Sequence, residues 1–218
     1  MEEHHLPEEE GLEEAQAEEA ESEQESEPLH QEARPSLIRA LGVYPAFRET
    51  IETVLLAVLI ILLVNSTTGR FRVLGFSMEP TLHDGQYIIV SRVVYMIHAP
   101  ERGDVVVLRA PHNIGGNYIV KRIVGLPGER VEIRDGKVLV NGMLLEEPYI
   151  AEPGLYSGTW ILGSDEYFVL GDNRRNSSDS HNGGVFTRKD IVGKAWLCYW
   201  PPEDWGRVRH HAFTEAEP

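Results

Sequence analysis

Three short segments of the sequence carry side chains that can perform nucleophilic or acid–base chemistry. In the first, residues 75–82 (GFSMEPTL), Ser77 follows an expected strand, and Pro80 restricts the backbone just beyond it. A serine in such a turn either caps the next segment or presents its hydroxyl as a nucleophile. The G-x-S-x-G nucleophile elbow is excluded, because Glu79 stands where its second glycine would be.

The second segment, residues 117–129, places Lys121 within a run of Ile, Val and Tyr. With the two-residue period of a strand, Ile119, Lys121 and Ile123 share one face. The lysine therefore either reaches out at the rim of an amphipathic edge strand or lies against apolar surface. Burial would lower its pKa from the usual value of about 10.4, so that a neutral amine could serve as a general base.

The third segment, residues 171–181 (GDNRRNSSDSH), follows a run that ends at Leu170. Small polar residues of this kind usually form a surface loop with Asx turns. In a catalytic site they would instead supply hydrogen bonds that orient a base. Each of the three segments taken alone has a purely structural explanation.

The elements that must position these segments are mostly strands. Short β-branched or aromatic runs are separated by Asp-Gly, Asn-Gly and Pro-Gly turns, and no helical period interrupts them. Asp135-Gly136 between two alternating runs predicts a hairpin. The sequence therefore predicts a mainly β domain with strands in residues 87–90, 105–108, 118–120, 131–133, 137–140 and 167–170.

An apolar run precedes the first chemical segment. Residues 53–69 contain no charged side chain, a length at the low end of the range of about 17–25 residues for a spanning helix. Arg48 and Arg70 can extend outward and lengthen the usable span. A core helix would show a polar face, and a cleaved signal sequence would lie nearer the start of the chain. We expect a membrane anchor at residues 47–69.

Charge is distributed unevenly along the 218 residues. Residues 1–33 contain fourteen Glu and no Lys or Arg, which leaves 21 acidic against 20 basic residues in the remainder. Such a segment cannot bury enough apolar surface to fold, so residues 1–35 are expected to form a disordered acidic tail. No basic stripe suggests a nucleic-acid partner, and no metal-ligand spacing or cofactor motif is found. The single cysteine, Cys198, cannot form an intrachain disulfide.

Taken together and in this order, the three segments resemble the conserved boxes of bacterial type I signal peptidases, the leader peptidases of family S26 with a Ser–Lys dyad. The matching patterns are S-M-x-P-T-L from Ser77, K-R-x-x-G-x-P-G from Lys121 and G-D-N-R-x-x-S-x-D-S from Gly171. The resemblance extends over roughly residues 51–195 and includes the anchor directly before the serine motif.

The resemblance implies a fold and an activity. The fold would be the signal-peptidase and repressor-protease type of β-fold, built of antiparallel sheets, with a catalytic domain at residues 70–205. A smaller inserted β-subdomain would occupy about 126–166, and residues 206–218 would be a flexible C-terminus. The activity would be that of a membrane-bound serine endopeptidase without cofactor, which cleaves signal peptides from secretory preproteins after small residues at −1 and −3.

The resemblance also assigns roles to individual residues. Ser77 would be the nucleophile and Lys121 the general base, which Ser177 would orient by a hydrogen bond. Asp179 and Asp172 would stabilise the loop.

Further positions follow from the same resemblance. Met78 would pack beneath the site, and Arg122 would be structural. Gly75 offers no side-chain donor where some members have a serine, so the backbone N–H of Ser77 would serve the oxyanion. The shallow apolar pockets for the substrate would be lined by Phe71, Val73 and Val120. Two positions depart from the common pattern, Arg175, where an acidic residue is usual, and His181, where an arginine often pairs with the loop aspartate.

The family's location would be the cell membrane, with a single span, a cytoplasmic N-terminus and the catalytic domain outside. Lipid and the secretion translocase would be its neighbours. Arg34, Arg39 and Arg48 before the apolar run and Arg70 and Arg72 after it give only a weak bias toward that orientation. Three alternatives compete with this interpretation of the sequence: a Ser–His relative, a self-cleaving repressor and an inactive membrane-anchored adaptor. Both Ser77 and Lys121 are present, which argues against the first and the last.

Overall fold

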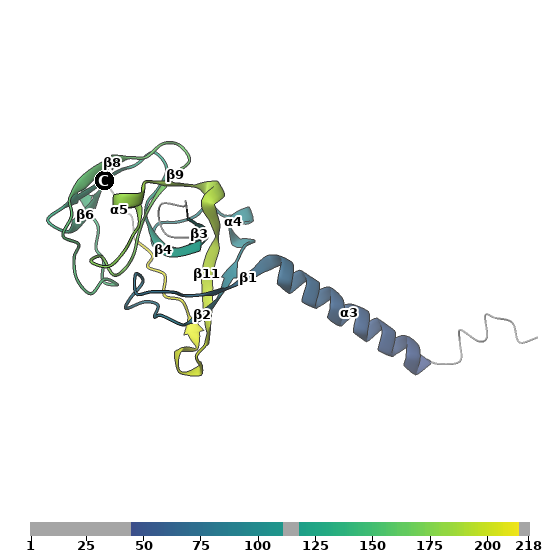
Figure 1. Ribbon diagram of the computed structural model, residues 1–218. Helices are drawn as coiled ribbons and strands as arrows, with labels where there is room; N and C mark the ends of the chain where they lie inside the picture. The colour runs from purple at the N-terminus through teal and green to yellow at the C-terminus, as the bar shows by residue number, and fades with distance from the viewer. Residues whose placement is uncertain (1–44, 111–117, 214–218) are drawn as a thin grey trace, which may run out of the picture. The chain divides into compact units, whose positions relative to one another are not determined.

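The computed structural model describes residues 45–110 and 118–213. The acidic tail expected at residues 1–35 lies outside the described residues. By its contacts the chain divides into two units, Met1–Val54 and Leu55–Pro218. All strands of the described residues lie in the second unit (Figure 1).

Helix α3 comprises Pro45–Thr67, and side chains from Phe47 to Ser66 are exposed. Its proline at the first helical position fits the fixed φ of that residue. The part Phe47–Thr67, with a mean hydropathy of 2.1, is long and apolar enough to cross a membrane by length and composition. Twenty-one residues rise about 31 Å, close to the hydrocarbon thickness of about 30 Å.

The helix ends two residues before the end of the anchor predicted at 47–69. Hydroxyls of its last turn donate back to its own carbonyls, as in the bond of 2.8 Å from the Thr67 hydroxyl to Leu63 O. From Thr68 onward the backbone pairs with a neighbouring strand, and this pairing replaces the helical hydrogen bonds.

A main antiparallel sheet occupies most of the second unit. Among the described residues it has eight strands in the order β1-β2-β11-β3-β4-β9-β10, with β12 beside β11. The long strand β11 thus lies between β2 and β3, far from its neighbours in sequence (Figure 1). The strands are β1 Thr68–Arg72, β2 Tyr87–Ser91, β3 Val105–Arg109, β4 Tyr118–Gly125, β9 Glu166–Leu170, β10 Phe186–Thr187, β11 Ile191–Trp200 and β12 Gly206–Arg207.

A second sheet, in the order β7-β6-β5-β8, falls within the range 126–166 expected for an inserted subdomain. Its predicted hairpin is present, with Asp135 at φ 48° and Gly136 at φ 74°. Two consecutive positive φ values are what a two-residue type I′ turn requires. Its strands are β5 Arg130–Arg134, β6 Lys137–Val140, β7 Met143–Leu144 and β8 Gly158–Ile161.

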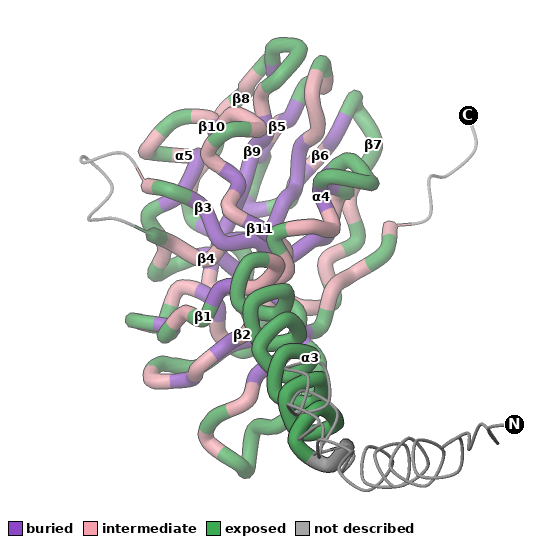
Figure 2. The backbone as a smooth tube through the Cα atoms, turned by 90° about the vertical axis from the view of Figure 1, so that its right-hand side faces the viewer, coloured by how far each residue is buried: buried purple, intermediate pink, exposed green. Residues whose placement is uncertain are grey.

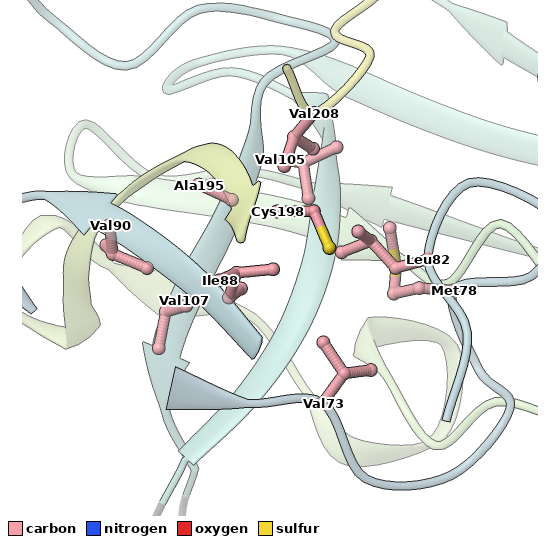
Figure 3. Packing of buried hydrophobic residues seen from close by; sticks show 10 residues of the cluster. All are labelled: Val73, Met78, Leu82, Ile88, Val90, Val105, Val107, Ala195, Cys198 and Val208. Carbon is pink, nitrogen blue, oxygen red and sulfur yellow. The ribbon is translucent and has the colours of Figure 1, made fainter. Parts of the chain in front are cut away.

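Three apolar clusters form the core, and buried backbone runs along β3 and β9 (Figure 2). One cluster joins the two sheets, because Val124 and Phe168 of the main sheet pack against Val131 of the second. Another contains Met78 and Leu82 side by side (Figure 3). Short helical segments, α4 Val94–Ile97, α5 Ser180–Gly183, η2 Arg188–Asp190 and η3 Pro202–Asp204, connect the strands.

The C-terminal segment differs from the expected flexible end at 206–218. Strand β12 pairs with β11, Val208 is only 6% exposed, and the His211 amide donates to Gly103 O. The packed domain therefore continues beyond residue 205, because this segment covers apolar surface of the main sheet that would otherwise face water. Residues 214–218 lie outside the described part.

His210 holds this segment against two strands. The Val105 amide donates to its Nδ1 at 3.0 Å, and its Nε2 lies 2.8 Å from Ala195 O. Such an arrangement needs a neutral ring with the proton on Nε2. Burial, with the cation of Lys194 beside it, lowers the pKa of His210 to about 4, although Asp104 opposes this shift.

Stability is therefore expected to fall as the pH falls from about 6.5 toward 4. Protons then bind the unfolded chain before they bind His210 in the folded one. Between pH 7.5 and 4.5 this group should remove about 2 kcal/mol of the free energy of unfolding. Denaturant titrations of the wild type and His210→Gln at both pH values measure it. An equal loss in the two proteins would contradict the assignment.

Candidate active site

Ser77 and Lys121 meet in the structure, with 2.6 Å between Lys121 Nζ and Ser77 Oγ. The serine comes from the turn that follows β1, and the lysine comes from the middle of β4. The two are 44 residues apart in sequence, and the fold of the main sheet brings them together. A hydroxyl and an amine at this distance can exchange a proton.

Lys121 is nearly inaccessible, with 3% of the residue exposed. Strand β4 is paired with β3 on one side and with β9 on the other, so the edge-strand alternative is excluded. Burial lowers the pKa of Lys121 to about 8, although the carboxylates of Asp179 and Asp172 oppose this shift. A substantial fraction of the amine is therefore neutral at mildly alkaline pH.

The turn that carries Ser77 is held from both ends. Gly75 adopts φ +83°, and its amide donates to Asp84 Oδ1 at 2.7 Å. Met78 is 1% exposed and packs into the cluster beneath the turn, as the resemblance implied (Figure 3). Within the described ranges the Ser77 amide has no hydrogen-bond partner, which leaves it available to an oxyanion.

Asn173 is a site residue whose role the sequence reasoning missed. Its backbone N–H donates to Ser77 O at 3.1 Å, and its side-chain Nδ2 donates to Phe76 O at 3.1 Å. The loop 171–181 is thereby attached directly to the backbone of the serine turn. The place of Asn173 in the G-D-N-R pattern was the available signal, but the pattern does not say which carbonyl the side chain reaches.

Asp179 is the centre of that loop. It is fully buried and accepts hydrogen bonds from the Gly171 amide and the Ser177 hydroxyl, while His181 Nδ1 lies 2.6 Å from its Oδ1. Burial favours the protonated carboxyl, but hydrogen bonds from His181, Gly171 and Ser177 outweigh it and lower the pKa of Asp179. Asp179 is thus paired with His181, one of the two residues that depart from the common pattern.

The expected bond from Ser177 to Lys121 is not found among the described residues. The Ser177 hydroxyl donates to Asp179 instead, because a carboxylate is a stronger acceptor than an amine. The charge of Asp179, in this loop, acts on Lys121 and opposes the lowering of the lysine pKa. Arg175, the other position that departs from the common pattern of the family, forms an exposed ion pair of 2.7 Å with Glu152.

Arg122 and Asp172 form a buried ion pair behind the site, with exposures of 1% and 0% for their side chains. The pair is bidentate, with 2.8 Å from Nε to Oδ1 and 2.7 Å from Nη2 to Oδ2. Thr81 of the serine turn donates to the same carboxylate, and the guanidinium lies 4.1 Å from the ring centre of Tyr149. These contacts tie β4, the serine turn and the loop into one unit.

Replacing Arg122 by methionine should therefore destabilise the domain by about 3–5 kcal/mol, because Asp172 would stay buried without its partner. Denaturant unfolding measures this loss. The double variant with Asp172→Asn should recover part of it, since no buried charge remains. As a control, Arg175→Met breaks an exposed pair and should cost at most about 1 kcal/mol. Equal losses in both arginine variants would contradict the argument.

The three residues expected to line a substrate pocket gather on one apolar cluster. Val73 is 3% exposed and belongs to that cluster, and Phe71 and Val120 are half-buried against it. Met78, which directly follows Ser77, belongs to the same cluster, so this apolar surface adjoins the serine turn. In residues 45–110 and 118–213 no group of three or more His, Cys, Asp or Glu side chains could hold a metal ion.

Fold and site together define a class of protein: an apolar helix followed directly by an antiparallel β-domain, in which a serine hydroxyl contacts a buried lysine amine. A serine hydroxyl in contact with a basic amine is the catalytic pair that a serine hydrolase needs.

Comparison with known proteins identifies the family. The family model for signal peptidase, peptidase S26, matches residues 47–200. The chain is 36% identical over 171 residues to a probable signal peptidase I-2 of Synechocystis, covering 76% of this chain and 78% of that protein. It is 39% identical over 160 residues to signal peptidase I of Bacillus amyloliquefaciens, covering 68% and 84% of the two chains. The chain therefore belongs to the signal peptidase S26 family and is a serine endopeptidase, which confirms the resemblance.

Proposed function

We propose that this protein removes N-terminal signal peptides from secretory preproteins, with Ser77 as nucleophile and Lys121 as general base. The observation that carries the proposal is the 2.6 Å contact between Ser77 Oγ and the amine of a lysine with a lowered pKa. The relatives named signal peptidase I support the substrate class.

In the first half of the reaction, neutral Lys121 accepts the Ser77 proton while the serine oxygen attacks the scissile carbonyl carbon. The carbonyl oxygen becomes an oxyanion, which the Ser77 amide stabilises, since Gly75 offers no side-chain donor. The C–N bond then breaks, and Lys121 returns its proton to the leaving amine. An acyl-enzyme ester remains on Ser77.

In the second half, Lys121 takes a proton from water, and the resulting hydroxide attacks the ester carbonyl. The tetrahedral intermediate that forms then collapses, which breaks the bond to Ser77 Oγ and releases the signal peptide with its new carboxyl terminus. The proton passes from Lys121 to Ser77 Oγ. Arg122 and Asp172 hold β4 against the serine turn throughout, while Asp179 faces the amine with a fixed charge.

Specificity follows in this proposal from the apolar surface beside the dyad. Phe71, Val73 and Val120 would line shallow pockets that accept small side chains at −1 and −3. Val73 is almost fully buried, so it would form the floor of such a pocket, and half-buried Phe71 and Val120 would form its walls.

The proposed location of the enzyme is the cell membrane. Helix α3 would be a single membrane anchor, with the N-terminus in the cytoplasm and the catalytic domain outside, where preproteins leave the translocase. The catalytic domain would extend from about residue 68 beyond residue 205 and include the second sheet as its subdomain.

The experiment is cleavage of a preprotein with Ala at −1 and −3 by the full chain in detergent micelles, followed by sequencing of the new N-terminus. One cut directly after the −1 residue is expected. Phenylalanine at −1 should slow the reaction at least 100-fold, because a shallow pocket cannot hold the ring. No product, or a cut that ignores the −1 side chain, would refute the proposal.

A further inference from the structure

A cavity lies away from the dyad, where helix α3 passes into strand β1. Its volume is about 460 Å³, and its lining includes Thr67, Thr68, Ser91, Trp196 and Arg207. Neither Ser77 nor Lys121 lines it. The reaction proposed above leaves this cavity without a role.

The cavity is fixed to the end of the helix. Thr67 is the last residue of α3, its carbonyl accepts a hydrogen bond of 2.9 Å from the Arg92 amide, and Thr68 is paired with Ser91. No linker separates the helix from the domain at this point. If Phe47–Thr67 crosses the hydrocarbon core, Thr67 lies at the core's boundary, and the cavity lies in the headgroup layer of about 5–7 Å. This holds for either direction of crossing.

The charges around the cavity suit an anion. Arg207 is exposed, lines the cavity and has no acidic partner within the described residues. Exposed Arg70 and Arg92 flank the same end of the helix and likewise form no ion pair in the part of the chain that the structure describes. Lys194 also lines the cavity, but Asp104 already neutralises it at 2.5 Å. Among the described residues, Arg207 is therefore the cation at the cavity that has no anionic partner.

The remaining wall is largely apolar. Val93, Val94 and half-exposed Trp196 line it, together with the hydroxyl-bearing Ser91. An arginine guanidinium above an apolar wall matches a molecule with a phosphate next to a hydrocarbon stem, and tryptophan is the side chain favoured at this depth of a membrane. A bare phosphate ion would leave the apolar wall without contacts.

We propose that this cavity binds the headgroup of an anionic phospholipid from the adjoining leaflet, with its phosphate on Arg207 and its glycerol and first methylenes on Val93, Val94 and Trp196. The inference rests on the membrane anchor of the proposed function and is independent of the cleavage chemistry.

The test is titration of the full chain in neutral detergent micelles with dihexanoyl-phosphatidylglycerol, followed by calorimetry or tryptophan fluorescence. Saturable binding is expected, with Kd raised at least fivefold in Arg207→Gln and largely restored in Arg207→Lys. The control is Lys137→Gln, which removes an equal charge from an exposed site on the second sheet and should leave Kd unchanged.

Two further ligands distinguish an anionic lipid headgroup from a zwitterionic one and from free inorganic phosphate. Dihexanoyl-phosphatidylcholine should bind at least fivefold more weakly, and inorganic phosphate should not bind measurably at the same concentrations. Equal affinity for the choline lipid, tight binding of free phosphate, or an unchanged Kd in Arg207→Gln would each overturn the proposal. Because no peptide substrate is used, a failure of cleavage and a failure of lipid binding are read separately.

Discussion

The Ser77→Ala variant is expected to lose about 10⁵-fold or more in kcat for preprotein cleavage while it remains folded. The loss is this large because no other hydroxyl within the described site contacts the Lys121 amine, so no acyl-enzyme can form. Single-turnover cleavage in detergent micelles measures the change, and thermal unfolding checks the fold.

Ser177→Ala is the matched control for this variant. It also removes one serine hydroxyl from the site, but that hydroxyl donates to Asp179 and not to the amine. We therefore expect a much smaller loss, and a shift in the pH profile more than in the limiting rate. Comparable losses in the two variants, or persisting cleavage in Ser77→Ala, would remove Ser77 from the role of nucleophile.

Replacing Lys121 by methionine or arginine is expected to lower kcat by about 10³–10⁴-fold. Methionine fills similar space without a basic atom, and arginine stays charged at every accessible pH. In the wild type, kcat/KM should rise tenfold per pH unit below about pH 8 and level off above it, because only the neutral amine can accept the proton. The rate–pH profile between 6 and 10 measures this.

Two results would contradict this role of Lys121. One is a flat wild-type profile between pH 6 and 8, and the other is full turnover by Lys121→Arg. Lys137→Gln, with its exposed side chain on the second sheet, serves as the control and should retain the wild-type profile.

Short-range patterns predicted the local elements well. The hairpin at Asp135-Gly136, the apolar helix and the strands that flank Lys121 follow from turn residues and periodicity, which act over a few positions. The two-residue period gave only a partial account of β4, because residues 121–125 are all buried. A strand covered on both faces loses the alternation that marks a half-exposed one.

Long-range contacts were beyond the reach of such patterns. The Ser177 hydroxyl donates its hydrogen bond to Asp179, and the Arg122 guanidinium lies over the Tyr149 ring, because folding brings these groups within reach of each other. The C-terminal error has the same origin. Residues 206–213 look polar and loop-like in sequence, but His210 finds two backbone partners, Ala195 and Val105, which are 15 and 105 residues away in sequence.

The position of β11 bears on when the enzyme can first become active as the chain is made. The β1–β2 pair, which leads to Ser77, and the β3–β4 pair, which carries Lys121, share no ladder, and β11 at Ile191–Trp200 is the strand that joins them. A nascent chain that has been synthesised only through residue 190 has both reactive side chains but lacks the strand that fixes their separation. We therefore expect the dyad to be assembled only after β11 has been synthesised, and a growing chain that stops before residue 191 to lack activity.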